Sequence, residues 1–316
     1  MKVGVIDMGT NTFHLVIVDI DNDKFNFLIR EKRAVRLGKG GINNGFITEE
    51  AMERALKTLD EFHAILLKNQ VSHVHATATS AVRNAKNGKD LADQIFARTG
   101  IKVEIISGLA EAEFIYYGVS QALEIGKEPA LIMDIGGGSI EFIIGNSESI
   151  LWKQSFEIGG QRMMELFHEN DPITSAEIKN IHDYLADQLD ELFIHLNQHA
   201  PKTLIGSSGT FDTLSDIYCE LGNVERTSGI TEYPLEMKGY HELAALLLKK
   251  TRNERMQLPG MIELRVDMIV VAVVLISYVI KKASIEHLRV SAYALKEGVL
   301  LSHLKGKGEL SPTNAK

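Results

Sequence analysis

The sequence predicts an α/β protein of two related domains, each with a mixed β-sheet flanked by helices. Three observations support this fold class. Strand-like and helix-like segments alternate along the chain, and the same order of segments occurs twice. A strand–turn–strand unit at residues 2–20 returns at residues 130–145. The length of 316 residues is enough for two domains that each bury a hydrophobic core.

The repeated unit becomes clear when Asp7 is placed on Asp134. The turn "DMGTNT" then aligns with the turn "DIGGGS", and apolar strands flank both copies. The aligned pairs are Gly9 with Gly136, Thr10 with Gly137, Asn11 with Gly138 and Thr12 with Ser139. Each copy therefore presents an aspartate and a polar, glycine-bearing turn. Two such turns facing each other would form a clamp for a phosphate group.

In both halves, apolar spacing predicts three strands followed by alternating helices and strands. In the first half, the predicted strands lie near 2–7, 13–20, 25–36, 72–79 and 102–107, and the helices near 48–69, 79–98 and 109–123. In the second half, the strands lie near 130–135, 140–145, 149–157, 202–206 and 285–291, and the helices within 159–199, after 209, and near 237–251, 262–282 and 292–304. No linker rich in proline or serine separates the halves, so the junction near residues 123–129 is short.

Composition excludes several classes of protein. The only cysteine, Cys219, rules out an intrachain disulfide framework and fits a reducing compartment, so we expect a cytoplasmic protein. The most apolar run, residues 268–280, is too short to span a bilayer, and we expect no membrane association. The net charge of −8 gives no global field that would attract a polyanion, so we expect no binding to nucleic acid. An anionic substrate would need a local basic patch.

The triple glycine at residues 136–138 is the strongest functional signal. Glycine tolerates positive φ and has no side chain to hold a ligand away, so backbone N–H groups can approach an anion closely. Side chains alternate along the strand that follows, which places Ser139 and Glu141 on one face. The alternatives are an ordinary glycine-rich hairpin without a ligand, and a solvated edge strand for Glu141.

Two aspartates and two glutamates are further candidates. Asp7 and Asp134 end equivalent strands, where they could hold Mg²⁺ or, alternatively, cap their turns through hydrogen bonds. Glu111 and Glu113 fall in the first turn of a predicted helix, where the helix dipole favours acids. Only one of the two can face a cleft, and their spacing does not choose between them.

Two weaker candidates for binding anions contain arginine or small residues. Arg83 follows "ATS" near a helix start, where a guanidinium and N–H groups would suit phosphate, although it could also lie on a solvated face. The segment "GSSGT" at 206–210 follows a predicted strand and opens a helix, as an anion site would. The histidines form no zinc-binding pattern, and Cys219 has no cysteine partner.

In this order along the chain, these motifs resemble the exopolyphosphatase / guanosine pentaphosphate phosphohydrolase family. The segments that carry the resemblance are "VIDMGTNTFHLVI", "ATSAVRNAKN", "ISGLAEAEFIYYGV", "DIGGGSIEFIIG", "GSSGT", "LRVDMIVVAVVLI" and "LRVSAYALKEGVL", over roughly residues 2 to 304. The family belongs to the superfamily of actin, sugar kinases and heat-shock chaperone ATPases.

The resemblance implies two ribonuclease-H-like (actin-like ATPase) domains, each with a mixed five-stranded sheet, and an active site in the cleft between them. The first domain would comprise residues 1–124 and a C-terminal helix at about 291–305 that crosses back to it. The second would comprise 125–290, and residues 306–316 would form a flexible tail.

The implied activity is Mg²⁺-assisted release of the terminal phosphate from inorganic polyphosphate, guanosine pentaphosphate, or both. The family's catalytic glutamate, which precedes an alanine, falls on Glu111 rather than Glu113, and a second catalytic glutamate falls on Glu141. The implied metal ligands are Asp7, Asp134 and Glu141. The implied phosphate ligands are Asp7, Gly9, Thr10, Asn11, Arg83, Gly136, Gly137, Gly138, Ser139, Ser208, Gly209 and Thr210.

Three positions depart from the common family pattern. Ile140 stands where threonine is common, Ser208 where a glycine is common, and Lys296 where arginine is common. Ile140 should point away from the face of Glu141, so we expect it to be tolerated. A kinase of the same superfold and a non-catalytic sensor of polyphosphate or nucleotide are the rival functions, and a homodimer is an option that the sequence leaves open.

Overall fold

The computed structural model describes residues 1–21, 24–71, 73–227 and 229–304. The chain divides into two compact units: unit 1 contains residues 1–114 and the C-terminal segment from Leu295, and unit 2 contains residues 115–294. The division lies inside helix α4 (Gly108–Ala122), whereas the sequence placed it after residue 124. The tail predicted at 306–316 lies outside the described residues.

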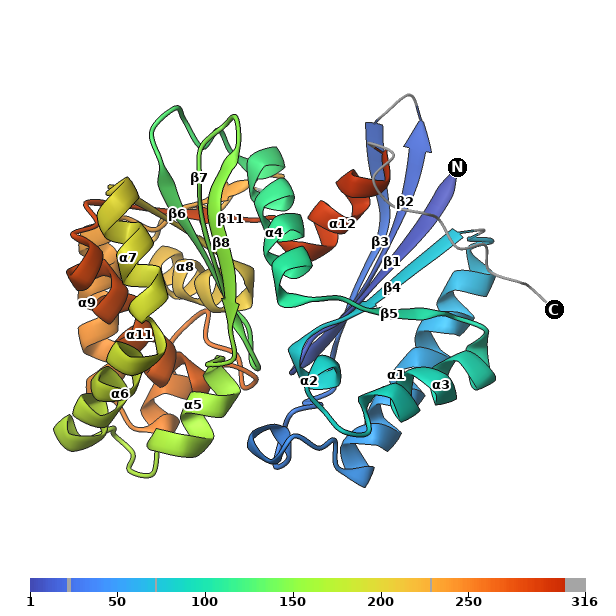
Figure 1. Cartoon of the computed structure of the whole chain (residues 1–316), viewed down its shortest axis with the longest axis horizontal. Helices are drawn as coiled ribbons and strands as arrows, with labels where there is room; N and C mark the ends of the chain where they lie inside the picture. Colours follow the sequence, from blue (N-terminus) through green and yellow to red (C-terminus); the bar gives the residue numbers. More distant parts are fainter. Residues whose placement is uncertain (22–23, 72, 228, 305–316) are drawn as a thin grey trace. The chain divides into compact units, whose positions relative to one another are not determined.

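Unit 1 contains a five-stranded mixed sheet in the order β3-β2-β1-β4-β5 (Figure 1). Strands β1 to β3 pair antiparallel, and β4 and β5 continue the sheet in parallel with β1. Its elements are β1 (Lys2–Met8), β2 (Thr12–Asp21), β3 (Lys24–Ala34), η1 (Ile42–Asn44), α1 (Glu49–Lys68), β4 (His73–Ala78), α2 (Ser80–Arg83), α3 (Gly88–Thr99), β5 (Val103–Ile105), the start of α4, and α12 (Leu295–Leu304).

Helices α1 and α3 cover one face of this sheet, as Figure 1 shows. Thr48 begins α1 because its hydroxyl accepts the N–H of Ala51, and Leu59 and Phe62 of α1 are fully buried against strand residues such as Phe13. The C-terminal helix α12 packs against β1. It starts at Leu295, later than the predicted 291, because β11 extends to Ser291.

Unit 2 contains a six-stranded mixed sheet in the order β10-β11-β9-β6-β7-β8, so the expectation of five strands is wrong here. The extra strand, β10 (Glu232–Tyr233), pairs antiparallel with β11. Two residues are too short a run to show the alternation by which a strand is recognised in sequence. The other elements are β6 (Ala130–Ile135), β7 (Ile140–Gly145), β8 (Ile150–Phe156), α5 (Gly160–Phe167), α6 (Ser175–Gln188), α7 (Asp190–His199), β9 (Thr203–Ser207), α8 (Ser208–Gly222), α9 (Met237–Lys249), α10 (Arg252–Met256), α11 (Met268–Ala283) and β11 (His287–Ser291).

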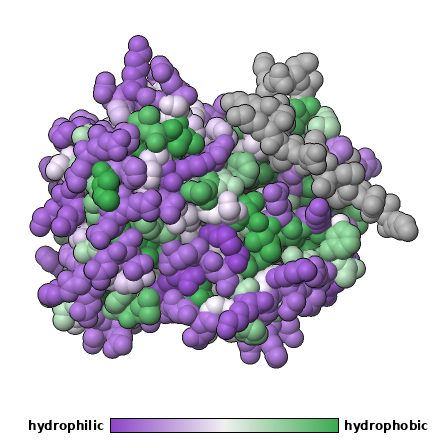
Figure 2. Space-filling model, in the orientation of Figure 1, coloured by the Kyte–Doolittle hydropathy of each residue, from purple (hydrophilic) through white to green (hydrophobic). Residues whose placement is uncertain are grey.

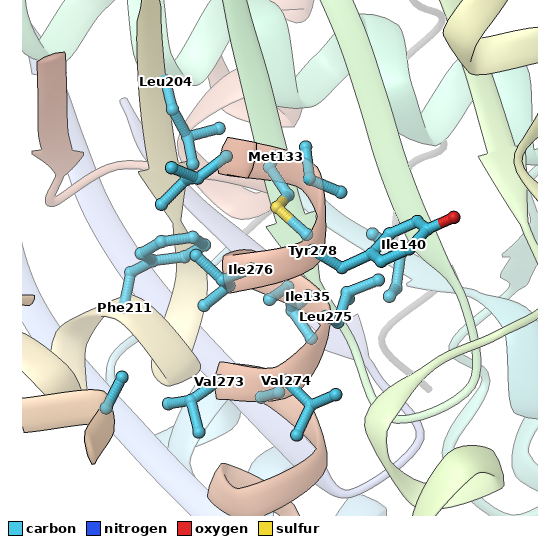
Figure 3. Packing of buried hydrophobic residues seen from close by; sticks show 14 of the residues in the cluster. Met133, Ile135, Ile140, Leu204, Phe211, Val273, Val274, Leu275, Ile276 and Tyr278 are labelled. Atoms are coloured by element: carbon cyan, nitrogen blue, oxygen red, sulfur yellow. The ribbon is translucent and has the colours of Figure 1, made fainter. Parts of the chain in front are cut away.

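Helix α11 forms the centre of the core of unit 2 (Figure 3). Its side chains pack against Met133, Ile135 and Ile140 of β6 and β7 and against Phe211 of α8. Ile140 is fully buried on this face, which confirms the expectation that it points away from Glu141. A hydrophobic side chain at position 140 therefore contributes to the hydrophobic core of unit 2.

The two sheets share one design, which confirms the internal repeat. Both start with an antiparallel three-stranded meander, and in both the first of those strands pairs in parallel with the strand that follows. Asp7 lies opposite His14 and beside Thr77, and Asp134 lies opposite Glu141 and beside Ser207. The alignment that superposes the two aspartates in sequence is therefore also the structural alignment.

The surface shown in Figure 2 is mainly hydrophilic, with hydrophobic residues interspersed. Among the helices of the described ranges, none has both the length and the apolar character that crossing a membrane requires.

Candidate phosphate-binding and catalytic site

The triple-glycine turn of unit 2 is held from one side by the N-terminus of α5. The turn closes through a bond from the Gly136 N–H to the Ser139 carbonyl (3.1 Å). The three glycine carbonyls then accept N–H groups at the start of α5: Gly136 from Gly160 (2.9 Å), Gly137 from Gln161 (2.9 Å) and Gly138 from Gly159 (3.1 Å).

This arrangement determines where the N–H groups of the turn point. In a trans peptide the C=O of one residue and the N–H of the next point in opposite directions. Because the carbonyls of residues 136–138 are directed at α5, the N–H groups of Gly137, Gly138 and Ser139 are directed away from it. Three neighbouring N–H groups on one side form an anion-binding nest.

The glycines serve this geometry by lacking side chains. None of Gly136, Gly137 and Gly138 has a positive φ, so left-handed backbone is not the reason for them. At Gly159, which caps the N-terminus of α5, an added Cβ would lie 2.5 Å from backbone atoms of Gly137 and Gly138, so α5 could not approach the turn with a side chain there. Arg162 adds a bond from its Nε to the Gly138 carbonyl (2.8 Å).

The equivalent turn of unit 1 has the same backbone pattern. The Gly9 N–H donates to the Thr12 carbonyl at 3.1 Å, as in unit 2. The Asn11 carbonyl accepts the N–H groups of Val35 and Arg36 (3.0 and 2.9 Å), and the Thr10 carbonyl accepts the N–H of Gly38 (3.0 Å). By the same peptide geometry, the N–H groups of Asn11 and Thr12 point away from the supporting loop.

Asp134 and Glu141 form a buried pair of carboxylates beside the glycine turn. They lie directly opposite each other on β6 and β7, and their exposed fractions are 6 % and 1 %. Ser207 donates its hydroxyl to Asp134 Oδ2 (2.7 Å), while Ser139 and Ser155 both donate to Glu141 Oε1 (2.7 Å each). The alternative of a solvated edge strand for Glu141 is therefore wrong, because β7 is an inner strand and the side chain is buried.

In unit 1, the structure brings Arg83 and Glu111 into contact. Arg83 Nη1 donates to Glu111 Oε2 (2.9 Å) and to the Ile106 carbonyl (3.2 Å). Both side chains are largely buried, so Arg83 does not lie on a solvated face. Ser107 holds the start of α4 by accepting the Ala110 N–H (3.2 Å), and Glu113 on the same turn is only half-buried. The structure therefore places a guanidinium in direct contact with the carboxylate of Glu111.

The "GSSGT" segment forms the end of β9 and the start of α8. Ser208 adopts φ +68°, a left-handed conformation that glycine accepts without strain. The Ser208 and Thr210 hydroxyls both donate to the Ile135 carbonyl at 3.4 Å. The resemblance led us to expect a glycine at this position, and the left-handed conformation of Ser208 is one that glycine adopts most easily.

Arg265 lies over the start of α8 and was missed by the sequence reasoning. An added Cβ at Gly209 would lie 3.1 Å from Arg265 Cζ, so the missing side chain makes room for the guanidinium. The exposed fraction of Arg265 is 9 %, and within the described part of the chain its Nε has no hydrogen-bond partner. Burial lowers the pKa of Arg265, while the carboxylates of Asp212 and Asp134 act in the opposite direction. The only signal in the sequence was one arginine before a very apolar segment.

No three histidine, cysteine or carboxylate side chains of the described ranges converge into a metal-binding group. Mg²⁺, however, is commonly held by one or two carboxylates together with substrate phosphate oxygens. Asp134 and Glu141 supply buried oxygen ligands on adjacent strands, so this pair fits Mg²⁺. Asp7, the third predicted ligand, belongs to unit 1.

Comparisons with known proteins agree on one family. The model of the Ppx/GppA phosphatase family matches residues 16–307. The crystal structure of an exopolyphosphatase from Cytophaga hutchinsonii is 50 % identical, superposes with a TM-score of 0.95, and the match covers 98 % of this chain and 99 % of that one. Exopolyphosphatase 1 of Mycobacterium tuberculosis is 27 % identical over 312 residues, 98 % of this chain and 90 % of the relative. A putative exopolyphosphatase of Haemophilus influenzae is 28 % identical over 307 residues, 95 % and 91 % of the two chains.

Proposed function

Because the chain belongs to the Ppx/GppA phosphatase family, we propose that it is an exopolyphosphatase that releases the terminal phosphate of inorganic polyphosphate. The observation that carries this proposal is the orientation of the glycine turn, which directs three peptide N–H groups away from α5 beside two buried carboxylates. A terminal phosphate has three non-bridging oxygens, which three N–H donors suit. The names of the relatives favour polyphosphate over guanosine pentaphosphate as the main substrate.

In the proposed reaction, water attacks the terminal phosphorus and the bridging P–O bond breaks. Glu111 takes a proton from the attacking water, and the shortened chain leaves with the electron pair of the broken bond. The N–H groups of residues 137–139 and the guanidinium groups of Arg83 and Arg265 stabilise negative charge on the phosphate oxygens. Glu141 orients the water or a metal ion. General-base assistance of this kind is worth about 10²–10⁴-fold in rate.

We propose Mg²⁺ as the cofactor, held by Asp134 and Glu141 with substrate oxygens, and with Asp7 as a further ligand. When bound, Mg²⁺ would neutralise charge on the phosphate oxygens and weaken the bond to the leaving group. Gly9, Thr10 and Asn11 of unit 1 and Ser208, Gly209 and Thr210 of unit 2 remain proposed phosphate ligands. We further propose that the enzyme also acts on guanosine pentaphosphate and that it forms a homodimer.

The test measures phosphate release from long-chain polyphosphate, guanosine pentaphosphate and ATP side by side, each with Mg²⁺ and with EDTA. We expect the highest kcat/KM on polyphosphate. Phosphate release should stop in EDTA and should return when Mg²⁺ is restored. Transfer of phosphate from ATP to an added acceptor without release would favour a kinase. Tight binding of polyphosphate without any release would favour a sensor. Full activity in EDTA would contradict the proposed cofactor.

A matched pair of variants tests the general base. Glu111→Gln should lower kcat by at least about 10²-fold with the fold intact, because the amide cannot accept the proton. Glu113→Gln, two residues along the same helix, should change kcat by less than about threefold, because the catalytic position of the family's motif falls on Glu111 and not on Glu113. Equal losses at both positions would contradict the assignment of Glu111.

A further inference from the structure

Ser155 holds the carboxylate of Glu141 from the neighbouring strand. The two residues lie directly opposite each other in the antiparallel pair β7–β8, so their side chains share a face. The Ser155 hydroxyl donates to Glu141 Oε1 at 2.7 Å, and the Ser139 hydroxyl donates to the same oxygen at 2.7 Å. None of the sequence motifs contains Ser155.

Two donors at one oxygen restrict the carboxylate in a way that one donor does not. The terminal torsion of a glutamate side chain is broad, so the carboxylate plane rotates easily unless it is held. Ser139 belongs to the glycine turn, whereas Ser155 belongs to a strand fixed by its own ladder to β7. Donors from two separate backbone segments therefore restrict the orientation of the Glu141 carboxylate.

Packing alone does not account for a serine at this position. On β8, Trp152 and Phe156 pack on the hydrophobic core, and Ser155 alternates with them onto the other face. Burying a carboxylate is costly unless hydrogen bonds replace those of water, and Glu141 is nearly inaccessible to solvent. The hydroxyl of Ser155 meets a requirement of Glu141 rather than one of the core.

We propose that Ser155 is a positioning residue for phosphoanhydride hydrolysis and that it acts entirely through Glu141. The inference rests on the proposed function, in which Glu141 orients the attacking water or a metal ion. Loss of the hydroxyl removes one of the two serine donors to Glu141 Oε1, so the carboxylate can rotate away from its working orientation. The rate of the chemical step should therefore fall. The affinity for substrate should stay the same, because binding relies on the N–H groups of the turn.

The first experiment compares Ser155→Ala with Ser155→Thr. We expect Ser155→Ala to lower kcat about 10-fold, within the range typical of residues that orient catalytic ligands, with KM unchanged within about twofold. Ser155→Thr keeps an O–H donor on a half-buried strand position that tolerates β-branching, and should restore kcat to within about threefold of wild type. Ser155→Cys, a near-isostere with a weak donor, should behave like the alanine variant.

The second experiment is a double-mutant cycle with Glu141→Gln. If Ser155 acts through the carboxylate, Ser155→Ala should cause no further loss of kcat in the Glu141→Gln background. A further 10-fold loss in that background would overturn the proposal, because Ser155 would then act independently of Glu141. Wild-type kcat in Ser155→Ala, or failure of Ser155→Thr to restore it, would also overturn the proposal.

Crystal structures of wild type and Ser155→Ala separate this inference from the proposed function. We expect the Glu141 carboxylate to rotate from its wild-type position when the Ser155 hydroxyl is absent, whatever the substrate of the enzyme is. An unchanged Glu141 side chain would overturn the inference. Absence of phosphate release by the wild type would instead overturn the proposed function.

Discussion

The strand–turn–strand units of unit 1 and unit 2 have the same backbone and different chemistry. Both turns close with a 3.1 Å bond between residues that align in sequence, Gly9 with Thr12 and Gly136 with Ser139. At the position opposite the aspartate that the two units share, however, unit 1 has His14 and unit 2 has Glu141. The two units thus share a way of presenting N–H groups, while the cross-strand partner of the aspartate is a histidine in unit 1 and a carboxylate in unit 2.

The supports of the two turns also differ. In unit 2, the N-terminus of helix α5 and Arg162 hold the glycine carbonyls. In unit 1, a loop takes this role, and Arg54 of α1 holds it by donating to the carbonyls of Val35 (2.8 Å) and Arg36 (3.1 Å). Arg36 is left-handed at φ +51°, a strained conformation that its hydrogen bonds maintain. Aligned helix peptides add a favourable potential for anions, so the turn in unit 2 should bind phosphate more strongly.

The largest expected effect is at Glu141, which lies opposite Asp134 where unit 1 has His14 opposite Asp7. Glu141→Gln should lower kcat by about 10²-fold or more, because the amide replaces one of the two carboxylate oxygens with a nitrogen donor. His14→Gln at the equivalent position of unit 1 should lower kcat by less than about fivefold. Steady-state kinetics on polyphosphate check both. Equal losses would mean that the two units contribute equally to the chemistry.

The next effect concerns the turns themselves. Gly137→Val should raise KM about 10-fold or more and lower the melting temperature much less, because φ at Gly137 is not positive and the added side chain would crowd the turn whose N–H groups are proposed to bind phosphate. Thr10→Val at the aligned position should raise KM by less than about threefold, since that turn already accommodates a side chain. A Gly137→Val variant with normal KM would show that the glycine turn does not bind substrate.

The supporting arginines should have smaller effects. Arg162→Met keeps the aliphatic stem but removes the bond to the Gly138 carbonyl, and we expect KM to rise about threefold to tenfold. Arg54→Met removes two bonds to the loop that holds the turn of unit 1, and KM should rise by no more than about threefold. A larger effect from Arg54 than from Arg162 would reverse the ranking of the two turns.

The smallest effect is expected at Ser208. Ser208→Gly should increase the free energy of unfolding by roughly 1 kcal/mol, because glycine adopts the left-handed conformation without strain. It should change kcat/KM by less than about twofold, because glycine keeps the backbone N–H through which residue 208 would bind phosphate. The equivalent entry into α2 in unit 1 has no left-handed residue and should gain nothing from glycine. Chemical denaturation checks the stability. A loss of activity above fivefold would assign the Ser208 hydroxyl to substrate binding.

Much of the fold could be predicted from sequence because the repeat and the apolar periodicity are strong local signals. The Asp7–Asp134 alignment predicted that the two aspartates end equivalent strands, as they do, and the family resemblance is confirmed by the match over residues 16–307. The sixth strand, β10, was not predictable because two residues carry no alternation. Its pairing with β11 depends on residues far away in sequence.

The candidate site was predictable only where its residues belong to short local motifs of the sequence. The turn residues and Glu111 appear as short patterns in sequence, whereas Ser155 and Arg265 reach the site through pairing and packing that no local pattern shows. The contact between Arg83 and Glu111 likewise depends on how β5 and α4 follow β4 in space. The roles of all these residues stay predictions until variants are measured.

The most direct test of the central claim follows the products of a long polyphosphate on a gel over time. If the turn binds a terminal phosphate and Glu111 activates water against it, orthophosphate should accumulate from the start without a burst of intermediate lengths. The Glu111→Gln variant under the same conditions should release about 10²-fold less orthophosphate. A ladder of mid-length fragments, or wild-type release by Glu111→Gln, would contradict the account.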